Sequence, residues 1–177
     1  ISGLENLPKD GAGIVAANHV SLWDPVAVVA ASPRVIHFMA KAELFSNSFL
    51  NWFFRKAHAF PVKRGLADRT AIRTGLEVLD SGELVGIFPE GTRNRTEEEL
   101  LPIQSGAALL AIKAQVPIIP VIVKGTESLK FRRKIHVIIG KPIHPVAGNR
   151  ATKVELGAMN ERISKELSLL NMQDFTY

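Results

Sequence analysis

The sequence contains no cysteine. Its absence excludes disulfide bonds, thiolate metal sites, a cysteine nucleophile and a thioester formed on the protein itself, and it fits a reducing compartment. No apolar run approaches the ~20 residues that a membrane-spanning helix needs, and no signal peptide is recognisable. The chain starts at Ile1, and we expect that an N-terminal membrane-associating segment is absent from it.

Charge and composition describe an ordinary globular chain. Its 177 residues are 46% hydrophobic and 22% charged, which predicts one domain over residues 1–177 with a full core. The net charge is +5, and residues 101–177 alone carry +6. Such a basic segment favours an anionic partner, either a phosphorylated ligand, an anionic lipid surface or nucleic acid, although a solvated basic face explains it equally well.

Short apolar runs alternate with amphipathic stretches along the chain. Each apolar run is bounded by Gly, Pro or charge and predicts a strand: 13–19, 35–40, 59–64, 84–89, 118–125 and 134–140. Helices are predicted between them: 24–31, 47–57, from the N-cap Asp68 to the stop at Gly82, 105–115 and 152–171. Alternation of this kind predicts an α/β domain with a mostly parallel, mixed sheet and helices on both faces.

The first motif that carries chemistry follows the first strand. His19 ends the run GIVAANH, and Asp24 opens the next helix. A short turn between them lets the carboxylate fold back on one imidazole nitrogen, which fixes the tautomer and leaves the other nitrogen as a base. The alternative is that Asp24 is only a helix N-cap and His19 a buried core residue.

Two further motifs follow other strands. Lys63 and Arg64 form a cation pair after the third run, able to grip a phosphate or simply to stay solvated. The fourth run ends in the turn FPEGTRNR, with Gly91, Thr92 and Arg93, which offer close backbone approach, a hydroxyl and a planar guanidinium. The alternative is a polar turn in which Glu90 forms a local ion pair with Arg93. Because ligands bind at the carboxyl ends of parallel strands, we expect all three motifs to meet at one edge of the sheet.

In order and spacing, these motifs resemble the glycerophospholipid acyltransferase family, most closely the 1-acyl-glycerol-3-phosphate acyltransferases. The family pattern N-H-x-x-x-x-D is matched by Asn18, His19 and Asp24. Later blocks are matched by Phe60 to Arg64, by FPEGTR from Phe88 to Arg93, and by Val116 to Val121. The resemblance covers residues 18–121 and implies a glycerol-3-phosphate acyltransferase-like fold.

The resemblance also implies a mechanism and a set of site residues. His19 would remove the proton from the free hydroxyl of a lysophospholipid, most simply 1-acyl-glycerol-3-phosphate, and Asp24 would orient His19 while the oxygen attacks an acyl thioester. The acceptor phosphate site would consist of Arg64, Glu90, Gly91, Thr92 and Arg93. No metal ion and no cofactor is implied.

The implied partners are acyl-CoA or acyl carrier protein as donor, the lysophospholipid acceptor and an anionic membrane surface at the cytoplasmic face of the cell membrane. Nucleic acid is not expected, because the chain has a single Tyr and its Phe and Trp cluster in one apolar stretch. That stretch, Leu44 to Phe54, could line an acyl tunnel, dip into a bilayer or form a core helix.

Three alternatives remain open from the sequence. Ser21, two residues after His19, could be a nucleophile, although its hydroxyl is better suited to cap the local turn. The same His and Asp could serve a hydrolase of acyl or phosphate esters. The chain could also be a phospholipid-binding domain without catalytic activity.

Overall fold

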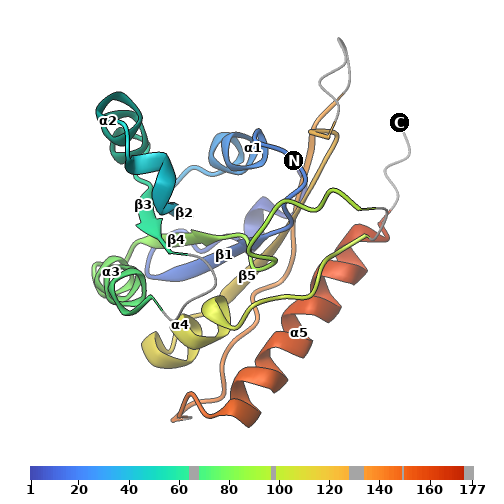
Figure 1. Cartoon of the computed structure of the whole chain (residues 1–177). Helices are drawn as coiled ribbons and strands as arrows, with labels where there is room; N and C mark the ends of the chain where they lie inside the picture. The colour runs from blue at the N-terminus through green and yellow to red at the C-terminus, as the bar shows by residue number, and fades with distance from the viewer. Residues whose placement is uncertain (64–67, 97–98, 128–133, 149, 174–177) are drawn as a thin grey trace.

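The structure is a computed structural model, and it describes residues 1–63, 68–96, 99–127, 134–148 and 150–173. A single sheet forms the middle layer, and helices cover both of its faces (Figure 1). The strands are β1 (Gly13–Ala17), β2 (Ile36–Lys41), β3 (Phe60–Val62), β4 (Leu84–Ile87), β5 (Ile118–Lys124) and β6 (His136–Ile139).

The strand order in this sheet is β3-β2-β4-β1-β5-β6. All neighbouring pairs are parallel except β5 and β6, which are antiparallel. The predicted α/β fold with a mostly parallel, mixed sheet is therefore confirmed. Since β1 lies between β4 and β5, segments about 70 and 105 residues further along the chain flank it on either side.

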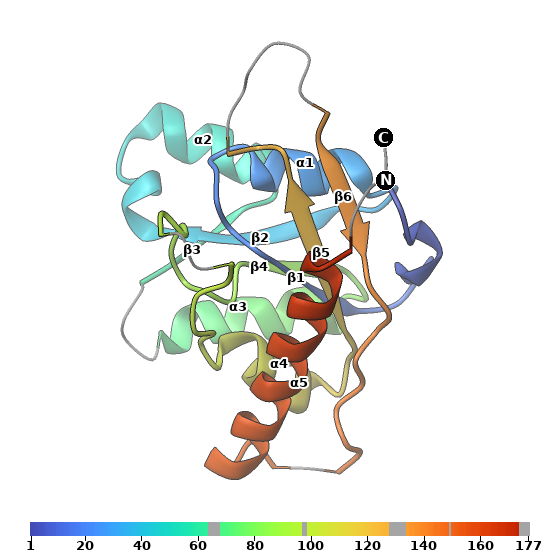
Figure 2. The same cartoon turned by 90° about the vertical axis from the view of Figure 1, so that its right-hand side faces the viewer.

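The helices are α1 (Asp24–Ala31), α2 (Ser48–Lys56), α3 (Arg69–Asp80), α4 (Gly106–Ala114) and α5 (Lys153–Asn171), with short 3-10 turns η1 (Leu4–Asn6) and η2 (Ala42–Phe45). Helix α1 lies on one face of the sheet, whereas α3, α4 and α5 lie on the other (Figures 1 and 2). Helix α2 stands on the α1 side, beside the β2–β3 edge (Figure 1).

Local capping signals explain where the helices begin. The Asp68 side chain accepts hydrogen bonds from the backbone N–H groups of Thr70 and Ala71, as expected for the predicted N-cap. Thr152 and Glu155 form a reciprocal capping box at the start of α5. Both helix starts agree with the predictions, because the residues that set them are neighbours in the chain.

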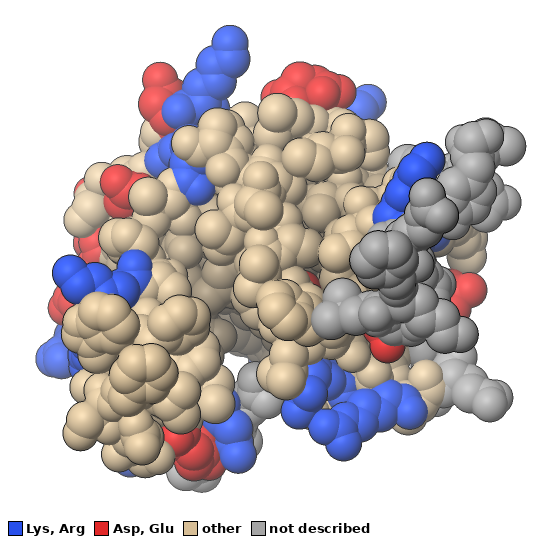
Figure 3. All heavy atoms as spheres, turned by 90° about the horizontal axis from the view of Figure 1, so that it is seen from above, with Lys and Arg blue, Asp and Glu red and all other residues tan. Residues whose placement is uncertain are grey.

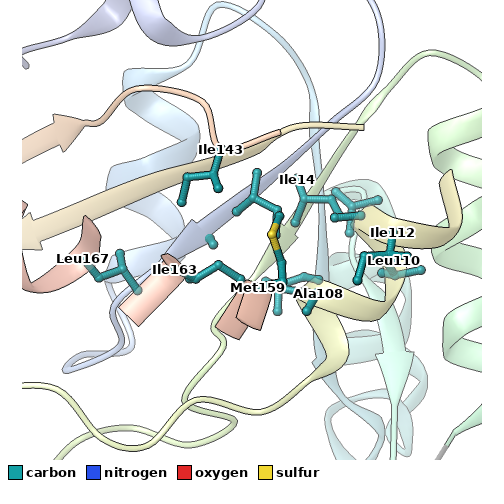
Figure 4. Packing of buried hydrophobic residues seen from close by; sticks show 14 of the residues in the cluster. Ile14, Ala108, Leu110, Ile112, Ile143, Met159, Ile163 and Leu167 are labelled. Atoms are coloured by element: carbon teal, nitrogen blue, oxygen red, sulfur yellow. The ribbon is translucent and has the colours of Figure 1, made fainter. Parts of the chain in front are cut away.

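Apolar side chains fill both faces of the sheet. Val28 and Ala31 of α1 pack on one face, and the larger cluster on the other face joins the sheet to α3, α4 and α5. Figure 4 shows this second cluster, in which Met159 of α5 lies between Ile163 and Ala108, with Ile14 of β1 nearby. The central strands β1 and β4 are buried throughout, as parallel strands covered on both faces must be.

Helix α2 contradicts one of the sequence-based alternatives, because none of its residues is buried. The interpretation of Asn47–Ala57 as a core helix is therefore wrong. The helix packs mainly on η2, at the edge of the sheet, where no sheet face remains to cover its apolar side chains. Among the helices of the described segments, none has the length and apolar character needed to cross a bilayer.

A glycine on β4 accommodates an aromatic ring from β2. Gly86 and Phe38 are paired across the two strands. A Cβ added to Gly86 would lie only 2.6 Å from the Phe38 ring, so the ring lies directly over the glycine backbone. This close approach brings the Phe38 ring to the side chain that follows β4, Phe88.

Candidate active site

Two of the three predicted motifs meet at the carboxyl edge of the sheet. His19 follows β1 by two residues, and Phe88 directly follows β4. Because β1 and β4 are adjacent and parallel, their ends lie side by side. The remaining motif, the cation pair that begins with Lys63, follows β3. Strand β3 is three positions from β1 in the sheet, so the two strands lie about 14 Å apart at the usual strand spacing.

The backbone of His19 is held on both sides by the segment after β4. Its N–H donates to Oε1 of Glu90 at 2.8 Å, and its C=O accepts from the N–H of Asn94 at 2.6 Å. The other oxygen of Glu90 accepts from the N–H of Leu101 at 2.9 Å. These bonds join the FPEGTR turn to the histidine, across more than 70 residues of sequence.

The imidazole of His19 pairs with the carboxylate of Asp24. Nδ1 lies 2.9 Å from Oδ2, and the two residues are 7% and 0% exposed. The carboxylate does not cap α1: it turns back and accepts from the N–H groups of Val20 and Ser21, both at 2.7 Å. Within the described ranges, Nε2 of His19 has no hydrogen-bond partner, so this nitrogen is left to accept a proton.

An aromatic ring fixes the plane of this imidazole. The rings of His19 and Phe88 are stacked, with centroids 4.1 Å apart and planes 19° apart. Phe88 in turn stacks on Phe38 at 5.2 Å. The histidine is therefore held in its plane by Asp24 and against its face by Phe88.

Burial and hydrogen bonding act in opposite directions on the two buried carboxylates. Burial alone would raise the pKa of Asp24, but bonds from His19, Thr126, Ser21 and Val20 outweigh it and lower that pKa below 3.8. At Glu90 burial prevails over the two backbone bonds and raises the pKa above 4.5. Asp24 is therefore kept as the anion that a histidine base requires.

The predicted phosphate-binding residues lie in different surroundings. Gly91 adopts the left-handed region at φ 71°, as the turn requires. Thr92 is exposed, and Arg93 is half-buried with no hydrogen bond or ion pair among the described residues. In particular, no ion pair joins Glu90 to Arg93 in that part of the chain. Arg64 lies outside the described residues.

Other details of the site went unrecognised in the sequence or were left as alternatives. The Ser21 hydroxyl accepts from the N–H of Trp23 at 3.3 Å, the local capping role expected of it. Asn18 is part of a recognised motif, yet its contact with Val123 was not foreseen. Thr126 was missed entirely; the sequence shows only a polar residue directly after the predicted strand 118–125, and not the strand order that brings it to Asp24. In the described segments, no three His, Asp or Glu side chains are grouped to hold a metal ion.

Comparison with known proteins identifies the family of the chain. A family model described as Acyltransferase matches residues 1–124. The 1-acyl-sn-glycerol-3-phosphate acyltransferase of Bacillus subtilis is 37% identical over 94% of this chain and 84% of its own length. The Streptococcus pneumoniae enzyme of the same name is 36% identical over 73% of this chain and 49% of its own length.

A solved structure matches over nearly the whole chain. It is the 1-acyl-sn-glycerophosphate acyltransferase PlsC from Thermotoga maritima, with a TM-score of 0.73 and 28% identity over 99% of this chain and 73% of that one. Sequence motifs, fold and relatives thus agree, and the chain belongs to the acyltransferase family.

Proposed function

We propose that this enzyme transfers an acyl chain from an acyl thioester to the free hydroxyl of 1-acyl-glycerol-3-phosphate, which gives phosphatidic acid. The observation that carries the proposal is the buried His19–Asp24 pair, with Nε2 of the histidine unpartnered among the described residues, beside the FPEGTR turn. The names of the relatives support the same acceptor.

The chemistry follows from the position of the two side chains. Nε2 of His19 takes the proton of the acceptor hydroxyl as its oxygen forms a bond to the thioester carbonyl carbon. The Asp24 carboxylate, 2.9 Å from Nδ1, stabilises the imidazolium that results. The carbon–sulfur bond then breaks, and the thiolate of coenzyme A or of an acyl carrier protein leaves and takes up the proton.

We assign the acceptor phosphate to the residues of the FPEGTR turn together with Arg64. The half-buried Arg93 has no partner among the described residues, so its guanidinium fork is free to bind phosphate oxygens. Gly91 and Thr92 lie in the same turn. Glu90 has a more indirect part, because both its oxygens accept backbone N–H groups and its charge would repel a phosphate.

The test is an assay of purified protein with acyl-CoA and acyl carrier protein donors and a panel of acceptors. We expect phosphatidic acid to form from 1-acyl-glycerol-3-phosphate with at least one donor. Thioester cleavage at the same rate without any acceptor would instead identify a hydrolase. Equal rates of product formation with acceptors that carry a phosphate and acceptors that lack one would overturn the assigned phosphate site.

We propose in addition that an anionic membrane surface binds the outer sides of α1 and α2. Large apolar side chains on this α1–α2 face remain exposed: Leu22, Trp23, Val26, Phe49, Trp52 and Phe53. Charged side chains gather around the margin of this side of the molecule (Figure 3), and Arg55 and Lys56 end α2. Exposed aromatic residues beside basic ones are typical of helices that lie in a membrane interface. Acyl thioesters are found inside the cell, so we expect binding at the cytoplasmic face.

Vesicle flotation tests this surface. Trp52→Ser and Phe49→Ser should weaken binding to phosphatidylcholine–phosphatidylglycerol vesicles. Val154→Ser should not, because Val154 is a still more exposed apolar residue but lies on α5, on the other face of the sheet. Activity on a short-chain, water-dispersed acceptor should stay unchanged in all three. Unchanged flotation of the Trp52 and Phe49 variants would overturn the assignment.

A further inference from the structure

The carboxylate of Asp24 receives hydrogen bonds on both oxygens, and they come from different parts of the chain. Oδ2 accepts three local donors, from His19, Val20 and Ser21. Oδ1 accepts the hydroxyl of Thr126 at 2.5 Å, across 102 residues of sequence. Thr126 is 1% exposed, so water does not compete for this bond.

The direction of this bond is set by its chemistry. An ionised carboxylate only accepts, so the Thr126 hydroxyl donates. With Oδ1 held by Thr126, the carboxylate group cannot turn about its Cβ–Cγ bond, and Oδ2 stays directed at Nδ1 of His19. The hydroxyl also stabilises negative charge on a group that is fully buried. Both effects serve a histidine that must keep its proton on Nδ1.

The position of Thr126 is itself fixed by the end of β5. The Asn18 side chain donates to the C=O of Val123 at 3.1 Å and accepts from its N–H at 2.7 Å. This pair of bonds holds Asn18, the residue before His19, against Val123 of β5, three residues before Thr126. Gly125 then bends the chain at φ 92°, where an added Cβ would meet the backbone oxygen of Lys134.

From these contacts we infer that Thr126 is a positioning residue for acyl transfer: its hydroxyl holds the Asp24 carboxylate so that Oδ2 keeps the His19 base in its working tautomer and orientation. The predicted effect of Thr126 on kcat rests on the proposed function. The predicted effect on the His19 ring does not depend on that function.

Two substitutions separate the hydroxyl from the methyl group of Thr126. Thr126→Val keeps the shape and removes the donor, so kcat should fall about tenfold to a hundredfold with the acceptor KM within about twofold of the native value. Thr126→Ser keeps the donor and should retain most of kcat. A residue that served only packing would give the reverse order, which would overturn the inference. If the valine variant does not fold, Thr126→Ala against Thr126→Ser makes the same comparison.

A double-mutant cycle tests whether Thr126 acts through Asp24. In an Asp24→Asn background, Thr126→Val should lower kcat by less than about twofold further, because the carboxylate that it positions is already gone. Losses that multiply would show that Thr126 acts elsewhere, and would overturn the inference.

The tautomer of His19, read from its imidazole ¹⁵N shifts, gives a readout that needs no activity. The native protein and Thr126→Ser should show mainly the Nδ1–H form at neutral pH, and Thr126→Val a mixture with the Nε2–H form. If the native protein transfers no acyl group yet the tautomer responds, the proposed function fails and the positioning role stands. An active native protein with kcat and tautomer both unchanged in Thr126→Val would overturn the positioning role alone.

Discussion

Asp24 and Glu90 are buried carboxylates that both bond to His19, one to its ring and the other to its backbone N–H, yet their pKa values move in opposite directions. The difference lies in the donors. Among the described residues, Asp24 accepts four hydrogen bonds and Glu90 accepts two. At Asp24 the donors together outweigh burial, whereas at Glu90 burial outweighs the two backbone donors.

This contrast predicts opposite pH dependences of stability. The folded pKa of Asp24 lies below 3.8, so its contribution to the free energy of unfolding is complete above that pH and is lost as pH falls through the lowered pKa. The folded pKa of Glu90 lies above 4.5, so the folded state loses stability as pH rises from 4.5 through the raised pKa. Urea unfolding of the native protein against Asp24→Asn and Glu90→Gln, from pH 3 to pH 8, measures both differences. Slopes of the same sign would contradict this account.

Replacement of the base should abolish most turnover without loss of binding. His19→Ala removes the proposed base for the acceptor proton, so kcat should fall at least ~10²-fold while the acceptor KM changes little. His144→Ala is the matched control, since His144 is exposed and lies outside the site. A folded His19→Ala variant that keeps native turnover would refute the assigned mechanism.

The stack on Phe88 should contribute to catalysis as well as to packing. Phe88→Leu keeps apolar volume but removes the flat face 4.1 Å from the imidazole, so we expect kcat to fall by about threefold to tenfold, in line with the 0.5–1.5 kcal/mol of an aromatic pair. Phe60→Leu, the same change on β3, should lower the melting temperature but leave kcat unaltered. Equal effects of the two substitutions on kcat would show that the stack is not specific.

Arg93 provides a test of phosphate recognition. Arg93→Ala should cost about 1.5–3 kcal/mol in kcat/KM for 1-acyl-glycerol-3-phosphate, and Arg93→Lys less, because lysine keeps the charge but not the planar fork. Monoacylglycerol, which lacks the phosphate, should be a poor acceptor that loses little more in Arg93→Ala. Arg95→Ala, an exposed arginine of the same loop, is the control. Equal losses for both acceptors would mean that Arg93 supports the loop and does not bind phosphate.

The parts of the site that could be predicted from the sequence are the local ones. The His19–Asp24 pair spans five residues, and a short turn suffices to join it. The helix starts at Asp68 and Thr152 likewise depend on neighbours in the chain. These features follow from backbone geometry alone.

The contacts of Glu90 and Thr126 could not be predicted, because they depend on strand order. Only the placement of β1 between β4 and β5 brings both residues to the histidine turn, and alternation of strands and helices leaves that order open. Helix α2 shows a second limit. Its apolar spacing is that of a core helix, but its place at the edge of the sheet leaves no surface to bury it against.

Gly86 has a consequence for how sequences of this fold can change. The ring of Phe38 occupies the volume that a side chain at position 86 would need, and it supports Phe88, which lies against the imidazole of His19, the proposed base. The side chains at positions 38 and 86 therefore compete for the same space. A larger residue at position 86 on β4 requires a smaller one at position 38 on β2. Any such exchange would remove the ring on which Phe88 stacks, so the two positions are linked to His19 through Phe88.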